Sequence, residues 1–81
     1  SLAPNPAYSV LNVGFRAEAP AWVHIQVFDA KGRLVLTQPV ETSAGENAVT
    51  LDVSGLDAGL YWLSLADKSV VLTKRFVVLR D

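Results

Sequence analysis

The side chains that could carry out acid–base or nucleophilic chemistry are few and far apart in this chain. His24 is the single histidine among 81 residues, and the sequence contains no cysteine. A lone imidazole acts as a base or a metal ligand only with partner groups, and no Gly-x-Ser-x-Gly elbow is present. We therefore interpret His24 as a solvent-facing strand residue and expect no catalytic residue.

The carboxylates do not form a catalytic pair or a metal site either. Asp29 and Asp57 each begin a glycine-containing turn, where an aspartate oxygen accepts hydrogen bonds from main-chain N–H groups. The spacing of a calcium loop is absent, and so is a glycine-rich phosphate loop. The sequence predicts a protein without enzymatic activity, metal or cofactor.

The charge balance argues against two classes of partner. Seven basic and eight acidic residues give a net charge of −1 without a basic block, which disfavours binding to nucleic acid and to anionic membranes. The longest apolar runs have about four residues, whereas a membrane span needs roughly 20. Because methionine and a secretory leader are absent, we expect residues 1–81 to be one domain excised from the end of a larger precursor.

Apolar residues recur at every second position along most of the chain, as in strands that bury one face. The expected strands are 8–15, 21–29, 33–39, 47–53, 59–66 and 69–79, the last with a kink near Thr73. Six or seven short strands at this spacing predict an all-β fold, an immunoglobulin-like antiparallel β-sandwich. A small barrel is the alternative.

Two of these strands, 59–66 and 69–79, carry apolar residues on both faces. Either loops cover the second face, or that face docks on a partner. In addition, Trp22, Phe28 and Trp62 lie on the apparent non-core faces of their strands. Exposed aromatic rings can stack on sugars, so one alternative function is a carbohydrate-binding or structural immunoglobulin-like accessory module of a surface protein.

Four stretches, taken in order, resemble one family. They are Ala3-Pro4-Asn5-Pro6 with Leu11-Asn12-Val13, Val27-Phe28-Asp29-Ala30-Lys31-Gly32-Arg33-Leu34-Val35, Leu56-Asp57-Ala58-Gly59-Leu60-Tyr61, and Lys74-Arg75-Phe76-Val77-Val78-Leu79-Arg80. These four motif segments are similar to the "PNP" start, the "iyd..Gr.v" hairpin, the "L.aG.Y" motif and the basic-then-apolar closing strand of type A sorting domains. Such domains are the C-terminal sorting domains of the type IX, or Por, secretion system.

The resemblance implies a non-catalytic address at the C-terminus of a secreted cargo protein. Such a domain crosses the inner membrane of a Gram-negative bacterium with its cargo and folds in the periplasm, where the outer-membrane translocon recognises it. A sortase-like peptidase then typically removes it, and the cargo reaches the outer-membrane surface or the extracellular space. The implied partners are this machinery and the covalently attached N-terminal cargo. A homodimer through the terminal strand is a further open alternative.

The resemblance also supplies candidate recognition residues within the motif segments. They are Gly32, Arg33, Val35, Gly59, Tyr61, Lys74, Arg75, Phe76, Val77, Val78, Leu79 and Arg80. We hypothesise that residues 74–80, with the 32–35 hairpin beside them, form the recognition surface. We expect the two glycines to serve turn geometry, and Tyr61 to hydrogen-bond a loop backbone as a tyrosine corner does.

Overall fold

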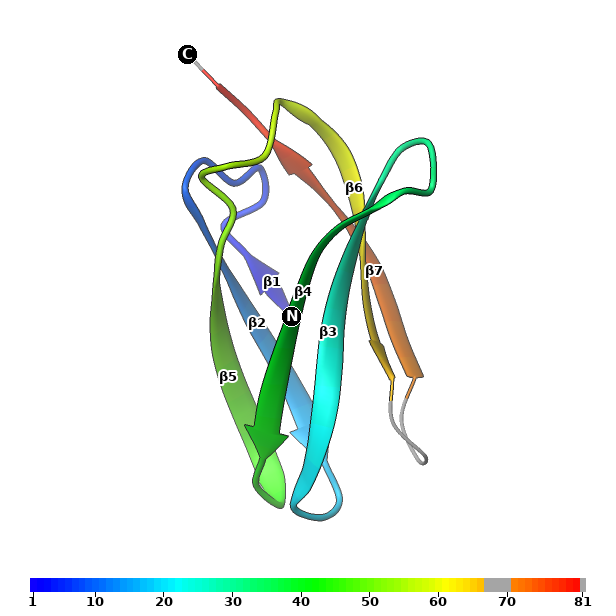
Figure 1. Cartoon of the computed structure of the whole chain (residues 1–81). Helices are drawn as coiled ribbons and strands as arrows, with labels where there is room; N and C mark the ends of the chain where they lie inside the picture. Colours follow the sequence, from blue (N-terminus) through cyan, green and yellow to red (C-terminus); the bar gives the residue numbers. More distant parts are fainter. Residues whose placement is uncertain (67–70, 81) are drawn as a thin grey trace.

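The computed structural model describes residues 1–66 and 71–80, and these form two antiparallel sheets that face each other across a hydrophobic core (Figure 1). The strands are β1 (Leu2–Ala3), β2 (Val10–Ala17), β3 (Ala21–Asp29), β4 (Leu34–Thr42), β5 (Gly45–Asp52), β6 (Gly59–Ala66) and β7 (Val71–Val78). The described residues contain no helix. The predicted immunoglobulin-like β-sandwich is confirmed, and the barrel alternative is not what forms.

One sheet has the strand order β1-β2-β5, and the other has the order β4-β3-β6-β7. The chain passes between the sheets after β2, after β4 and again after β5, so consecutive strands often lie in different layers. β3 and β6 are the central strands of the larger sheet, whereas β4 and β7 lie at its two edges. This order decides which motif segments become neighbours.

The strand boundaries match the predictions best where turn residues are unambiguous. β3 and β6 have the expected bounds, while β4 and β5 extend into the polar stretch 42–47 and leave only Ser43 and Ala44 between them. The Asn47 side chain makes this short turn, because its Oδ1 accepts the Ser43 N–H at 2.9 Å and its Nδ2 donates to the Ser43 carbonyl at 2.9 Å. The expected strands 33–39 and 47–53 left residues 40–46 between them, so the observed turn is shorter than the sequence predicted.

Two further predictions about the ends of the chain need correction. β1 was not expected, and it pairs with β2 through Leu2 opposite Val13. β7 runs without interruption through Thr73, so the predicted kink is wrong. The expected start of that strand at residues 69 and 70 lies outside the described residues, as do residues 67 and 68 between the expected strands 59–66 and 69–79.

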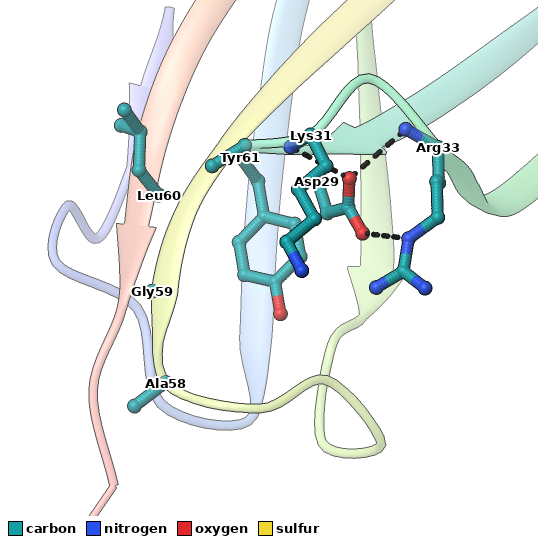
Figure 2. Close-up of a pocket in the computed structure, with 8 residues that line it drawn as sticks. Asp29, Lys31, Arg33, Ala58, Gly59, Leu60 and Tyr61 are labelled. Carbon is teal, nitrogen blue, oxygen red and sulfur yellow. Dashed lines mark hydrogen bonds and ion pairs between the residues drawn. The ribbon is translucent and has the colours of Figure 1, made fainter.

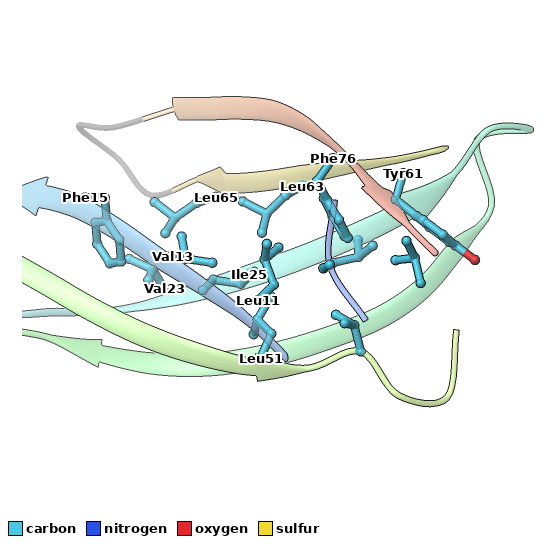
Figure 3. Close-up of a cluster of buried hydrophobic side chains, with 14 of the residues drawn as sticks. Leu11, Val13, Phe15, Val23, Ile25, Leu51, Tyr61, Leu63, Leu65 and Phe76 are labelled. Atoms are coloured by element: carbon cyan, nitrogen blue, oxygen red, sulfur yellow. The ribbon is translucent and has the colours of Figure 1, made fainter. Parts of the chain in front are cut away.

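The core is built from the alternating positions that the sequence singles out (Figure 3). β2 contributes Leu11, Val13 and Phe15, and β3 contributes Val23, Ile25 and Val27, all with less than a tenth of their surface exposed. Leu51 and Val53 approach from the end of β5, and Leu63, Leu65, Phe76 and Val78 from β6 and β7. Each buried position faces the opposite sheet because side chains alternate along a strand.

Candidate functional site

Parts of all four motif segments, which lie far apart in the sequence, come together at one end of the sandwich. Figure 1 shows the β3–β4 turn, the β5–β6 loop, the segment after β1 and the residues after β7 all at the end where the C-terminus lies. We call this region the motif end, defined as residues 4–9, 30–33, 53–60 and 77–80. The opposite end carries the turns at 18–20 and 43–44.

The β3–β4 turn is organised by Asp29. Its Oδ1 accepts hydrogen bonds from the Lys31 and Arg33 N–H groups, both at 2.9 Å, and its Oδ2 accepts one from Arg33 Nε at 2.8 Å. The Arg33 N–H, aided by the guanidinium, lowers the pKa of this carboxyl below its ordinary value. Gly32 has a φ of 84°, in the left-handed region that suits glycine. The predicted turn roles of Asp29 and Gly32 are confirmed.

The Leu56–Tyr61 motif lies against this turn. Tyr61 is the Cα partner of Asp29 across the β3–β6 pair, and its hydroxyl donates to the Asp57 carbonyl at 2.7 Å. The expected tyrosine corner is therefore present, with the main-chain oxygen of Asp57 as the acceptor. The ring packs on Phe76 with centroids 5.7 Å apart, and burial raises the pKa of the Tyr61 phenol.

The two motifs together enclose a shallow cavity of about 170 Å³ (Figure 2). It is lined by Asp29, Ala30, Lys31, Arg33, Ala58, Gly59, Leu60 and Tyr61. Every lining residue belongs to the second or the third motif segment. The cavity is thus the place where these two segments become one surface.

The first motif segment contacts the last strand directly. Ala7 pairs with β7 in parallel, with its N–H donating to the Val77 carbonyl at 2.8 Å and its carbonyl accepting the Leu79 N–H at 2.9 Å. The Val77 N–H donates to Asn5 Oδ1 at 3.1 Å. Residues 5–7 therefore cover the outer edge of β7 from Val77 to Leu79.

Arg80 connects the end of the chain to the rest of the motif end. Its Nη2 donates to the carbonyls of Val53 at 2.7 Å and of Leu56 at 2.6 Å, and its Nη1 donates to the Tyr8 carbonyl. A planar guanidinium can serve several carbonyls at once, which an ammonium group cannot do in a fixed geometry. This side chain thereby fixes the β5–β6 loop that leads into the third motif segment.

The candidate recognition residues divide into a buried and an exposed set. Tyr61, Phe76 and Val78 have 6%, 1% and 0% of their surface exposed, so they contribute through the core. The exposed candidates are Gly32, Arg33, Val35, Gly59, Lys74, Arg75, Val77, Leu79 and Arg80. The hypothesis that the 32–35 hairpin lies beside residues 74–80 is wrong, because β3 and β6 separate β4 from β7.

The outer face of the larger sheet carries exposed apolar residues near the motif end. Leu34, Phe28 and Trp62 are aligned across β4, β3 and β6, and Leu60 is aligned with Val77 across β6 and β7. The second apolar face of β6 and β7 is therefore not covered by loops. Leu34, Leu60, Trp62 and Val77 keep 36–51% of their surface exposed.

The tryptophans do not form a shared platform for a sugar. Trp62 is the Cα partner of Phe28, whereas Trp22 lies six residues earlier on β3, about 20 Å away along the strand. Both rings are exposed on the outer face, as the sequence predicted, and so is the predicted solvent-facing His24. Trp22 and Trp62 are therefore too far apart to stack together on one sugar ring or on two adjacent rings.

Asn5, Ala7 and the backbone carbonyls that hold Arg80 were not predicted as parts of the site. Asn5 stood in the first motif segment, but its contact with Val77 joins residues 72 positions apart, which no local pattern reveals. Asp52 was also missed. Its Oδ1 accepts the Ser54 hydroxyl at 2.6 Å and the Ser54 N–H at 3.0 Å, and these bonds lower the pKa of the carboxyl. An Asp-x-Ser pattern before a glycine could have indicated this turn.

Within residues 1–66 and 71–80, no three histidine, aspartate or glutamate side chains gather in a way that could hold a metal ion. Over the same ranges, no helix has the length and apolar character to cross a membrane.

A protein-family model described as the secretion system C-terminal sorting domain matches residues 1–79, which covers all four motif segments apart from Arg80. No curated protein matches the chain.

Proposed function

The chain belongs to the family of secretion system C-terminal sorting domains, and from this we propose how it directs an attached cargo protein through the type IX secretion system. The domain is a sorting signal and not a catalyst, and it implies secretion to the cell surface or beyond. In our proposal the cargo precedes residue 1, the domain folds in the periplasm, and the outer-membrane translocon recognises it there. A sortase-like peptidase then separates it from the cargo.

We place the recognition surface at the motif end and on the adjoining outer face of β6 and β7. The observation that carries this proposal is the convergence of the motif segments: Asp29 faces Tyr61, Ala7 pairs with Val78, and Arg80 holds the loop at Val53 and Leu56. The segments thus have one surface in common.

Recognition at this surface depends on shape and apolar contact. The protein has a net charge of −1 and lacks a block of one sign, so long-range steering is weak. The large apolar residues exposed near the cavity include Leu60 and Trp62 on β6 and Val77 on β7. Apolar side chains held on a rigid sheet lose little entropy when a partner covers them.

A charge placed at Leu60 tests the proposal with little effect on the fold. Leu60 lines the cavity with 39% of its surface exposed, and Trp22 on the same outer face is 66% exposed at the opposite end. A fluorescent reporter with a secretory leader would carry the domain at its C-terminus in a bacterium with type IX machinery. We expect Leu60→Glu to reduce export at least about tenfold and the control Trp22→Glu to leave it unchanged.

Both variants would first be shown to unfold near the parent temperature. Equal export of the Leu60→Glu and Trp22→Glu reporters would contradict the proposed surface, and export of the parent from a strain without the translocon would contradict the function. Point changes are sharper than deletion of residues 74–81, because that deletion also removes Phe76 and Val78 from the core.

A further inference from the structure

Among residues 1–66 and 71–80, β7 presents a short stretch of backbone at the edge of the larger sheet that no other strand pairs with. The main-chain groups of Val77 and Leu79 bond to Asn5 and Ala7, and they therefore point away from β6, toward the outside of the sheet. Because backbone direction alternates along a strand, the N–H and C=O groups of Thr73 and Arg75 point the same way. In the part of the chain that the structure describes, no strand lies beside these two residues.

The side chains on this stretch are cationic on both faces of the sheet. Lys74 is the Cα partner of Leu63 on the inner face and is exposed, and Arg75 is the Cα partner of Trp62 on the outer face and is exposed. A strand added beside β7 would place its side chains about 4.5–5.5 Å from these two. Opposite charges at that distance stabilise the pair, and like charges destabilise it.

We propose that the edge of β7 at Thr73–Arg75 is a strand-addition site for an extended partner segment that carries acidic side chains. Strand addition uses main-chain hydrogen bonds for affinity and side-chain matching for specificity. The residues opposite Lys74 and Arg75 are consecutive in the added strand, so the matching segment has two adjacent acidic residues. The residues that flank them are β-branched, as suits a strand. The inference rests on the proposed function, since it states how a partner of the sorting signal is held.

The other occupants of this edge are less favourable. The opposite edge strand, β4, contains Pro39, which has no N–H to donate to an added strand. Residues 5–7 already bond to the outer edge of β7 from Val77 onward, so the edge available to a partner strand ends before Val77. If a second copy of the chain paired antiparallel with β7 about Lys74 or Arg75, that residue would lie opposite the same residue of the other copy. Two like charges would then meet. The edge therefore opposes the homodimer through the terminal strand.

The test uses the whole chain with a strand attached to its C-terminus by a flexible Gly/Ser linker, which supplies a millimolar effective concentration. One fusion carries two adjacent glutamates flanked by valine and threonine, and the matched fusion carries two lysines in their place. Amide hydrogen exchange at Thr73 and Arg75 is the readout. We expect the glutamate fusion to slow both amides at least about tenfold relative to the lysine fusion.

Two substitutions locate the effect. Arg75→Glu together with Lys74→Glu reverses the preference, so that the lysine fusion becomes the protected one. Thr73→Pro removes an outward N–H that β6 does not use, and it abolishes the protection of Arg75. If this variant fails to fold, the charge reversal alone decides the matter.

Equal protection by both fusions, or protection by neither, would overturn the inference. Concentration-dependent self-association of the unfused chain in sedimentation would overturn it as well, because a second copy would then be the occupant. The measurement contains no secretion component, so its failure is distinguishable from a failure of the export assay.

Discussion

Arg80 Nη2 donates a hydrogen bond of 2.7 Å to the main-chain carbonyl of Val53, and this contact joins the second residue after β7 to the residue after β5 in the opposite sheet. Val53 is fully buried, and its carbonyl also accepts the Leu56 N–H at 3.0 Å, so Arg80 supplies a second hydrogen bond to it. Arg80 thus has a structural role in addition to any contact with a receptor.

Replacement of Arg80 should therefore weaken the fold. We expect Arg80→Ala to lower the free energy of unfolding by about 1–2 kcal/mol, since several charge-assisted hydrogen bonds to carbonyls are lost at a partly exposed position. Arg80→Lys should recover less than half of that loss, because an ammonium group cannot reach the same carbonyls together. Urea denaturation measures both. Arg16→Ala is the control, since the exposed Arg16–Glu46 pair at 3.6 Å contributes little; an Arg80→Ala loss no larger than this control would contradict the assignment.

The tyrosine corner gives a second prediction. Tyr61→Phe removes the hydroxyl that donates to the Asp57 carbonyl but keeps the ring that packs on Phe76. We expect a loss of about 1 kcal/mol in the free energy of unfolding. Tyr8→Phe serves as the matched control because Tyr8 is 52% exposed. If both variants lost the same stability, the Tyr61 hydrogen bond would have no special role.

Alkaline pH should destabilise the protein through the same side chain. The pKa of Tyr61 is raised above its ordinary value of 10.0 by burial, so the folded state holds its proton more strongly than the unfolded state does. The resulting stability is present in full below pH 10 and is lost as the pH rises through the higher pKa of the folded protein. Thermal unfolding from pH 9 upward should show a steeper decline for the parent than for Tyr61→Phe. Parallel declines would refute this origin.

Acid should weaken the β3–β4 turn. The pKa of Asp29 is lowered, chiefly by the Arg33 N–H, so its contribution is present above the unfolded pKa of about 3.9 and is lost as the pH falls through the lower folded value. Asp29→Asn should make stability less dependent on pH below about 4. The measurement is the urea midpoint between pH 2 and pH 5. An unchanged slope in the variant would show that Asp29 is not responsible.

The turn glycine gives a fifth prediction. Gly32 has a φ of 84°, and a Cβ there would meet no atom within 4 Å, so any penalty comes from the backbone alone. We expect Gly32→Ala to lower the free energy of unfolding by about 1–2 kcal/mol. Gly55→Ala, also in open space but outside the left-handed region, should change it by less than about 0.5 kcal/mol. Similar effects at the two glycines would show that φ is not the cause.

Local patterns predicted most of the fold. The two-residue period of Val23, Ile25 and Val27 identified β3 and its buried face, because a strand that buries one face must alternate. Turn chemistry identified Asp29 and Gly32 for an equally local reason. The site was predicted only as separate segments, since the contact between Asn5 and Val77 depends on where two distant strands happen to lie.

The sequence by itself determined the β-sandwich class and its buried alternating positions, both of which depend on residue type and spacing along the chain. The tertiary structure alone decided that β3 and β6 separate the 32–35 hairpin from β7, that residues 5–7 cover Val77 to Leu79, and that no strand among the described residues lies beside Thr73 and Arg75. Strand order follows from how the two sheets share one core, and that is a property of the whole chain with no local signal in any segment.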